Sequence, residues 1–309
     1  MRSTTDLTPF LDRLVGLDTI EPPVVVACSG GPDSLALLAL AAAVDLAPIA
    51  VYVNHGLRAE SPDDARVVAH AAEQLGIAWR AISVHIEHGP NLEARARDAR
   101  YNALERARID AGASGVLVGH TADDQAETVL LNVLRGSASR GLGGMAVRRD
   151  ALVRPLLRFR RADTEAVCSA LGLTPARDAM NDDPSFRRVW IRAEVLPALS
   201  AGAGRDLVPV LARQAELLRA DSDYLDELAR AAWPPSPDRA PAAALARLPL
   251  PLARRAVRQW LGAPPPSLAE VERVLLVARG DVRATELAGG RRVERSAGEM
   301  RCIPASVRR

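Results

Sequence analysis

The sequence predicts an α/β domain with a parallel sheet, followed by a helical linker and a small α+β domain at the C-terminus. Three observations lead to this prediction. Short apolar runs alternate with helical patterns up to residue 157, as in repeated β-α-β units. A long, polar-faced helical stretch follows, and the Pro-rich segment 233–237 interrupts it. Beyond that segment, helical patterns precede short strands separated by glycines.

The first half contains five apolar runs that are short enough and rich enough in β-branched residues to be strands. These strands are expected at 24–28, 48–53, 81–86, 115–119 and 152–157. The helices between them are expected at 35–43, 61–76, 91–111 and 123–134. Repeated strand–helix units predict right-handed crossovers and a parallel sheet, whose strands bind ligands at their carboxyl ends.

Helical patterns predominate in the second half, at 161–171, 186–199, 206–232, 242–261 and 267–279. The run Trp-Pro-Pro-Ser-Pro at 233–237 is incompatible with a continuous helix and marks a boundary. We therefore predict a catalytic domain over 1–200, a long helix with a Pro-rich linker over 201–237, and a basic domain over 238–309.

The composition is that of a globular chain, with 48% hydrophobic and 25% charged residues. The longest apolar stretches fall short of the roughly 20 residues that span a bilayer. Cys28, Cys168 and Cys302 are far apart and have neither CxxC nor zinc-ligand spacing. We therefore expect reduced thiols and a cytoplasmic protein.

The charge of the chain is unevenly distributed. All 40 basic residues are arginine, and residues 239–309 contain 14 of them against six acids, which gives +8. Because the whole chain carries +2, the first 238 residues carry −6. A basic C-terminal segment is typical of a protein that binds a polyanion such as RNA. An arginine-rich solvated surface that reflects biased codon usage would look the same, so charge alone leaves both interpretations open.

The most informative motif lies between the first predicted strand and its helix, and reads Ser29-Gly30-Gly31-Pro32-Asp33-Ser34. Glycines allow close backbone approach, and amide groups at a helix N-terminus favour an anion. Ser29 and Ser34 add hydroxyl donors, whereas Asp33 is better suited to a metal ion than to phosphate. No lysine follows the glycines, so this is not a Walker loop. The full string favours nucleotide binding over an ordinary glycine turn.

A second polar cluster ends the fourth predicted strand, where it should face the same crevice as the glycine motif. It reads Gly-His-Thr-Ala-Asp-Asp-Gln-Ala-Glu over 119–127. Asp124 and Glu127 are three residues apart, so they share a helix face and can hold an amine or a divalent ion. Capping of the helix N-terminus is an alternative role for the same acids, and the two roles are compatible.

A third group of polar residues lies on the helix predicted over 91–111. Arg97 and Arg100 can present two guanidinium groups to a phosphate. The same arginines could instead pair with Glu93 and Glu105 along a solvated face, and spacing alone favours that interpretation.

Two further basic motifs remain. His55 follows the second predicted strand and could donate to a phosphate, although a structural role is equally compatible. Arg188 and Arg192 lie one turn apart on the helix predicted over 186–199. Such a pair suits an RNA backbone or a triphosphate, and it is also common on ordinary helix surfaces.

Taken in order, these motifs resemble the tRNA(Ile)-lysidine synthetases, which are N-type ATP pyrophosphatases with a PP-loop (SGGxDS). The matching strings cover roughly the first 200 residues: SGGPDS (29–34), NHGLR (54–58), LEARARDARY (92–101), GHTADDQAETVLLNVLRGS (119–137), RPLL (154–157) and DAMNDDPSFRRVWIR (178–192). The resemblance implies a PP-loop ATPase domain of the adenine nucleotide alpha hydrolase-like type. It also implies a ligase that adenylates O2 of the wobble cytidine in the CAU-anticodon isoleucine tRNA. L-Lysine then displaces AMP to form lysidine, which changes codon reading from AUG to AUA.

The same resemblance implies roles for individual residues. ATP would contact residues 29–34 together with His55 and Arg97, and Asp33 would bind Mg²⁺. Asp33, Asp124 and Glu127 would be catalytic, the last two by orienting and deprotonating the lysine amine. The tRNA would contact Arg100, His120, Arg188 and Arg192. The implied partners are this tRNA and L-lysine, with no membrane, and the protein could be a monomer or a homodimer.

Three other functions agree less well with the sequence. A tRNA 2-thiocytidine-type sulfur transferase normally needs paired cysteines, which this chain lacks. Amide-forming relatives usually need an ammonia source, and no glutaminase segment is evident. A nonenzymatic RNA- or nucleotide-binding module would not need the acidic cluster at 123–127.

Overall fold

The computed structural model describes residues 6–54, 61–86, 89, 92–176, 187–233 and 240–304. The chain divides into two compact units, residues 1–219 and 220–309. Helix α10 (Val208–Ala232) contributes to both units. The three-part division with boundaries at 200 and 237 stays a prediction from sequence.

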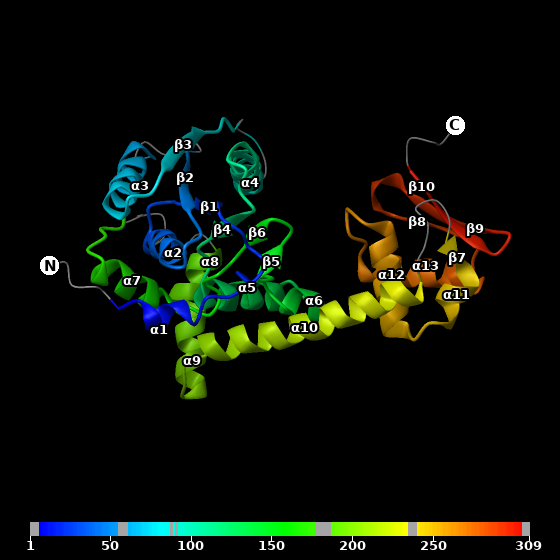
Figure 1. The fold of residues 1–309 in the computed structure, drawn as a ribbon. Helices are drawn as coiled ribbons and strands as arrows, with labels where there is room; N and C mark the ends of the chain where they lie inside the picture. Colours follow the sequence, from blue (N-terminus) through cyan, green and yellow to red (C-terminus); the bar gives the residue numbers. More distant parts are fainter. Residues whose placement is uncertain are drawn as a thin grey trace. The chain divides into compact units, whose positions relative to one another are not determined.

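The first unit is built on a six-stranded sheet with the order β3-β2-β1-β4-β6-β5 (Figure 1). Its strands are β1 (Val24–Ala27), β2 (Pro48–Asn54), β3 (Trp79–Ser83), β4 (Gly115–Val118), β5 (Arg148–Arg149) and β6 (Leu152–Val153). All neighbouring pairs are parallel except β5 with β6. The α/β fold class with a parallel sheet is therefore confirmed.

Helices cover both faces of this sheet (Figure 1). Helices α2 (Pro32–Ala43), α3 (Ser61–Leu75) and α7 (Arg161–Ala170) lie on one side of the sheet and α4 (Leu92–Asp110) on the other. The unit also contains α1 (Thr8–Leu11), α5 (Ala122–Leu134), α6 (Ser139–Leu142), α8 (Arg187–Trp190), the π-helix η2 (Ile191–Val195) and α9 (Leu196–Ala203). Side chains alternate along a strand, so Val24 and Val26 pack with α2, α3 and α7, whereas Val25 packs with α4. The sheet thus has a hydrophobic core on each face, as expected for parallel strands.

Several predicted elements differ in extent from the observed ones. The strand expected at 152–157 ends at Val153, because the following residues turn at Pro155. The helix expected at 186–199 contains the π-helix η2. The helix expected at 242–261 is two helices, interrupted at Pro249.

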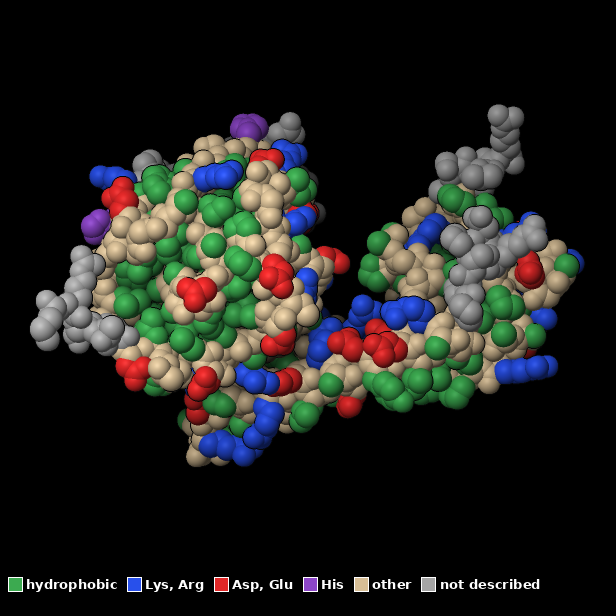
Figure 2. Space-filling view, viewed as in Figure 1, with side chains coloured by type: hydrophobic (Ala, Val, Ile, Leu, Met, Phe, Trp, Pro, Cys, Tyr) green, Lys and Arg blue, Asp and Glu red, His purple; other side chains and the backbone are tan. Residues whose placement is uncertain are grey.

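The second unit combines helices with a four-stranded antiparallel sheet in the order β7-β10-β9-β8, which confirms a small α+β unit. Its core contains Trp233, Leu245 and Val274. Basic side chains are spread over the visible face of this unit and do not form one patch (Figure 2). Its elements are β7 (Ala240–Pro241), α11 (Ala242–Arg247), α12 (Leu250–Leu261), α13 (Leu268–Arg279), β8 (Ala284–Glu286), η3 (Ala288–Gly290), β9 (Arg292–Ser296) and β10 (Glu299–Ile303).

Among the helices of the described ranges, no single one has the length and apolarity needed to cross a bilayer. One pair, Arg187–Ala203 with Val208–Ala232, meets the length and composition criteria only when taken together, and it is bent by 95°.

Candidate active site

The glycine motif forms the connection from β1 to α2, as the sequence predicts. Gly30 has φ of +88°, a conformation that side-chain-bearing residues rarely adopt. Gly31 caps α2 and Pro32 occupies its first turn. Ser34 Oγ donates to the Gly31 carbonyl (2.9 Å) and accepts from the Ser29 amide (3.2 Å). The loop is therefore folded onto the N-terminus of α2, where backbone amides favour an anion.

Asp33 lies in the first turn of α2 and is linked to α7. Thr164 Oγ1 donates a hydrogen bond of 2.5 Å to Asp33 Oδ1. Burial raises the pKa of Asp33 to about 6; the Thr164 hydrogen bond opposes this shift, and the negative charge of Asp124 adds to it. A cation close to Asp33 would therefore relieve the cost of burying its charge.

Asp124 caps helix α5 and also pairs with an arginine. Its Oδ2 accepts from the Thr121 amide (2.8 Å) and hydroxyl (3.1 Å), which forms a capping box at the start of α5. Its Oδ1 accepts from Arg161 Nη2 at 3.0 Å. Burial alone would raise the pKa of Asp124, but the Arg161 charge and the Thr121 hydrogen bonds hold it below its ordinary value.

Glu127 is fully buried and shares the same arginine. Its Oε1 accepts from Arg161 Nη2 (3.1 Å) and from Arg192 Nε (2.8 Å). Its Oε2 is buried and has no hydrogen-bond partner among the described residues. Asp124 and Glu127 therefore face one guanidinium from a shared side of α5, as their spacing predicts. Arg192, expected to contact tRNA, is bound to Glu127 in this structure.

The first turn of α7 connects these groups, and the sequence did not single it out. Arg161 contacts Asp124 and Glu127, while Thr164, three residues later, contacts Asp33. The neighbouring Asp123 accepts two hydrogen bonds of 3.1 Å from Arg160. Each of these contacts joins residues that are far apart in the chain, so the local sequence could not predict them. The sequence indicated only that a helix with a polar first turn begins at residue 161.

Although their spacing led us to expect it, Arg97 and Arg100 of α4 do not pair with Glu105. The guanidinium carbons of Arg97 and Arg100 lie 5.5 and 5.4 Å from the centre of the Tyr101 ring. Glu105 pairs with Arg108 at 2.6 Å, so the expected ion pair between Glu105 and the two arginines is wrong. The Glu93 side chain lies outside the described residues. Arg97 and Arg100 therefore flank an aromatic ring as two neighbouring cations.

His120 follows β4 and is partly buried. Its Nδ1 has no hydrogen-bond partner within the part of the chain that the structure describes. Burial lowers the pKa of His120 to about 4, although the Asp124 charge opposes the shift, so the imidazole is neutral at neutral pH.

Two other predicted contact residues are Arg188 and His55. Arg188 Nη2 donates to Thr128 Oγ1 at 3.3 Å. His55, a predicted ATP contact, lies outside the described residues.

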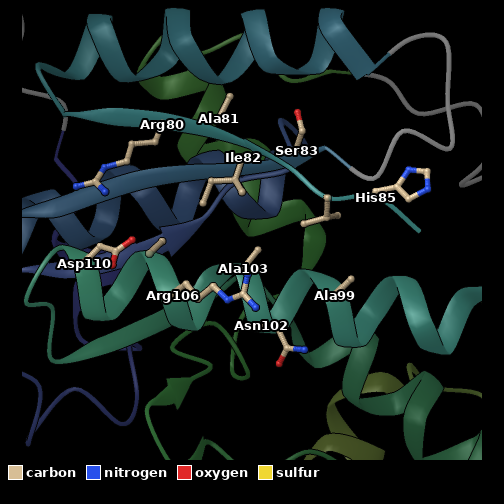
Figure 3. A pocket seen from close by; sticks show the side chains of 12 residues that line it. Arg80, Ala81, Ile82, Ser83, His85, Ala99, Asn102, Ala103, Arg106 and Asp110 are labelled. Carbon is tan, nitrogen blue, oxygen red and sulfur yellow. The ribbon is translucent and has the colours of Figure 1, made fainter. Parts of the chain in front are cut away.

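A groove of about 630 Å³ runs between β3 and α4 (Figure 3). Arg80, Ser83 and His85 line it from β3 and the segment that follows, and Asn102 and Arg106 line it from α4. No predicted site residue with a described side chain contributes to this groove. The groove therefore does not identify the site that the glycine motif and the acidic cluster form.

Asp33 is the residue expected to bind Mg²⁺. Within residues 6–304, as far as they are described, no group of three or more His, Cys, Asp or Glu side chains is arranged around a metal position. Mg²⁺ at nucleotide sites needs fewer protein ligands, since one or two carboxylates act together with phosphate oxygens and water. Asp33, buried at the start of α2 beside other acids, fits that arrangement as a single ligand.

Comparison with known proteins agrees with this geometry. The sequence model of the PP-loop domain family matches residues 7–199, so the chain is a PP-loop protein. It is 49% identical over 242 residues to a tRNA(Ile)-lysidine synthase of Mycolicibacterium paratuberculosis, with coverage of 76% of this chain and 73% of that one. It is 43% identical over 304 residues to a tRNA(Ile)-lysidine synthase of Salinispora tropica, with coverage of 91% and 90%. The chain belongs to the tRNA(Ile)-lysidine synthase family.

A solved structure shares the fold. The U34-tRNA thiolase of Methanococcus maripaludis superimposes with a TM-score of 0.54 at 19% sequence identity. The match covers 68% of this chain and 77% of the thiolase. At this level of identity the likeness concerns the fold alone, and the predicted PP-loop ATPase architecture is confirmed by it together with the family match.

Proposed function

We propose that this protein ligates L-lysine to C2 of the wobble cytidine in the CAU-anticodon isoleucine tRNA, using ATP and releasing AMP and pyrophosphate. The observation that carries the proposal is the first turn of α7. Through Thr164 and Arg161 it ties the glycine motif to the acidic pair Asp124 and Glu127. A phosphate cradle and a site for an amine therefore lie side by side, as a reaction between an adenylated base and an amine requires.

The nucleotide half of the reaction is assigned to residues 29–34, with Arg97 and His55 as further phosphate contacts. The amides at the start of α2 and the hydroxyls of Ser29 and Ser34 suit phosphate oxygens. Asp33 would hold Mg²⁺, which would neutralise charge on the departing pyrophosphate when bound. Adenylation converts O2 of the base into part of a good leaving group, AMP.

The amine half is assigned to Asp124 and Glu127. The substrate ammonium needs carboxylate acceptors, and the buried Oε2 of Glu127 has an acceptor position without a partner among the described residues. A carboxylate next to the amine can also accept the proton that must leave before attack on C2. Arg161 and Arg192 balance the charge of the acids, and the guanidinium group of Arg161 suits the carboxylate of a free amino acid.

The tRNA half is assigned to Arg100, His120, Arg188 and Arg192, supported by the +8 charge of residues 239–309. The relatives' names support an isoleucine tRNA as the substrate. A reaction on tRNA agrees with the cytoplasmic location expected from the sequence. The proposal needs no membrane, and it holds for a monomer or a homodimer.

The alternative, a sulfur transferase, is disfavoured by the cysteines of the first unit. Burial raises the pKa of Cys28 to about 12 and that of Cys168 to about 11, so neither is a ready thiolate. Both belong to the hydrophobic core of the first unit. A persulfide carrier would need an accessible and acidic thiol.

The proposal is tested by measuring AMP and pyrophosphate formation with purified protein. Sustained turnover should require ATP, L-lysine and a CAU-anticodon isoleucine tRNA together, and it should need no sulfur donor. The same tRNA with guanosine at the wobble position is the matched control and should give no turnover. Turnover that needs a sulfur donor or ammonia, and not lysine, would refute the proposal.

A further inference from the structure

Arg154 is a buried cation that the reaction outlined above does not use. It follows β6, and only 4% of its surface is exposed. Its Nη1 donates to the Ala146 carbonyl at 2.7 Å. Its Nε is buried with no hydrogen-bond partner, and no carboxylate pairs with it, within the described residues. A buried guanidinium without an anion is costly, so this position calls for an explanation.

Two more buried polar atoms without partners lie in the same neighbourhood. They are the Tyr101 hydroxyl on α4 and His120 Nδ1 after β4, each unpartnered within the residues described. Strands β4 and β6 are parallel neighbours, with Leu117 opposite Val153, so His120 and Arg154 follow adjacent strands at the same edge of the sheet. Burial lowers the pKa of Arg154, and the nearby Tyr101 side chain partly offsets this shift. Three elements of the first unit thus bring unpaired polar groups together.

The cluster is strongly cationic. Arg97 and Arg100 lie on the Tyr101 ring at 5.5 and 5.4 Å, and Arg97 also lies close enough to lower the pKa of Arg154. Asp124 is the acid close to His120, and it is already paired with Arg161. A bound anion would therefore meet several donors and a net positive charge.

The donors define the chemistry of that anion. Guanidinium, phenol and imidazole groups that approach from different elements suit a ligand with several oxygens in a tetrahedral arrangement, which is a phosphate group. The triphosphate of ATP is already assigned to the glycine motif at the start of α2. The phosphodiester backbone of RNA is the remaining source, and arginine contacts to phosphates are the ordinary means of holding RNA.

We propose that Arg154, Tyr101 and His120, flanked by Arg100, form a site for one phosphate group of the RNA backbone. The inference rests on the proposed function only in taking RNA as the source of the phosphate. A phosphate held here would fix the nucleotide strand beside Asp124 and the glycine motif. Arg154 is then a binding residue and is not part of the adenylation chemistry.

The test compares Arg154→Met with Arg135→Met in the full-length protein. Arg135 is exposed at the end of α5 and matches the charge change. We measure the affinity for an unmodified isoleucine tRNA transcript across a salt series, and separately the affinity for ATP. Arg154→Met should weaken tRNA binding about 10-fold or more and reduce the log–log salt slope by about one, while ATP affinity stays unchanged. Arg135→Met should change neither affinity.

Tyr101→Phe gives a second and milder measurement, because it removes only a hydroxyl oxygen that has no partner among the described residues. It should weaken tRNA binding a few-fold and leave ATP binding unchanged, and it decides the question if Arg154→Met does not fold. Loss of ATP affinity with normal tRNA binding would assign the phosphate to ATP and overturn the proposal. Normal binding of both ligands by folded variants would also overturn it. Because the readout is binding, failure of the site is distinguishable from failure of lysidine formation.

Discussion

Thr164 Oγ1 lies 2.5 Å from Asp33 Oδ1, although 131 residues separate them in the sequence. Thr164 is fully buried, and its hydroxyl oxygen also lies 2.8 Å from the Arg161 carbonyl, so its position is fixed by the first turn of α7. This contact restrains the one carboxylate of the glycine motif. We therefore expect Thr164 to act as a positioning residue for the proposed nucleotide site.

Replacing Thr164 by Val removes the hydroxyl and keeps the shape of the side chain. A hydrogen bond to a charged group contributes about 1.5–3 kcal/mol, so kcat/KM for ATP should fall about 10- to 100-fold. Thr164→Ser keeps the hydroxyl and should restore most of the loss. Calorimetric titration of ATP with and without Mg²⁺ provides a measure independent of turnover. Equal kcat/KM for the Val and Ser variants would show that the contact does not position Asp33.

Asp33→Ala should abolish adenylation of the tRNA while leaving the fold intact, because the variant lacks the carboxylate proposed to hold Mg²⁺. Pyrophosphate formation measures adenylation, and a thermal unfolding curve shows whether the variant is folded. Adenylation at the wild-type rate would remove Asp33 from the mechanism. Loss of the folded transition would leave the catalytic role to be tested with Asp33→Asn.

The raised pKa of Asp33 predicts that the stability of the folded protein depends on pH. Burial raises its pKa from 3.8 to about 6, so the folded state binds this proton more tightly than the unfolded state does. The resulting stability is fully present below about pH 3.8 and is lost as the pH rises through 6. At pH 8 the buried charge costs roughly 3 kcal/mol at most, since one pKa unit corresponds to about 1.4 kcal/mol. Asp33→Asn should therefore unfold at higher denaturant concentration than wild type at pH 8. A less stable variant at pH 8 would contradict the assignment.

Asp124→Asn and Glu127→Gln should raise the KM for lysine far more than the KM for ATP, because these carboxylates are proposed to meet the substrate ammonium. Asp123→Asn is the matched control. It neutralises an adjacent acid in the same helical turn, and that acid is bound to Arg160. Steady-state kinetics with each substrate varied in turn makes the comparison. If only the KM for ATP rises, the two acids act on the nucleotide side and the lysine site lies elsewhere.

Gly119 is needed where β4 approaches the glycine motif. A Cβ at this position would lie 2.9 Å from the Asp33 carbonyl oxygen and 3.0 Å from its carbon, both of which are backbone atoms. Gly119→Ala should therefore cost about 1–3 kcal/mol of stability and weaken ATP binding. Gly202→Ala is the control, since a Cβ there meets nothing within 4 Å. Equal unfolding midpoints and ATP affinities for the two variants would show that the close approach is unimportant.

The parts of the site that depend on local sequence could be predicted. The strand, glycine loop and helix around residues 29–34 form as expected, and Asp124 and Glu127 share a helix face because their spacing requires it. The contacts of Arg161 and Thr164 could not be predicted, because their partners lie on α2 and α5. A local sequence pattern does not indicate contacts between helices that are far apart in the chain. The predicted pairing of Glu105 was wrong because Arg108, three residues after it on the same face of α4, is its partner, whereas Arg100 is five residues before it.

The central claim is that free lysine becomes attached to C2 of the wobble cytidine. The most direct measurement is to incubate the protein with ATP, isotopically labelled L-lysine and total tRNA, and then to digest the tRNA and analyse its nucleosides by mass spectrometry. The account predicts a labelled nucleoside with the mass of lysidine, derived from the CAU-anticodon isoleucine tRNA and absent when ATP is omitted. A 2-thiocytidine product, or label that is released as free lysine by mild deacylation, would contradict it.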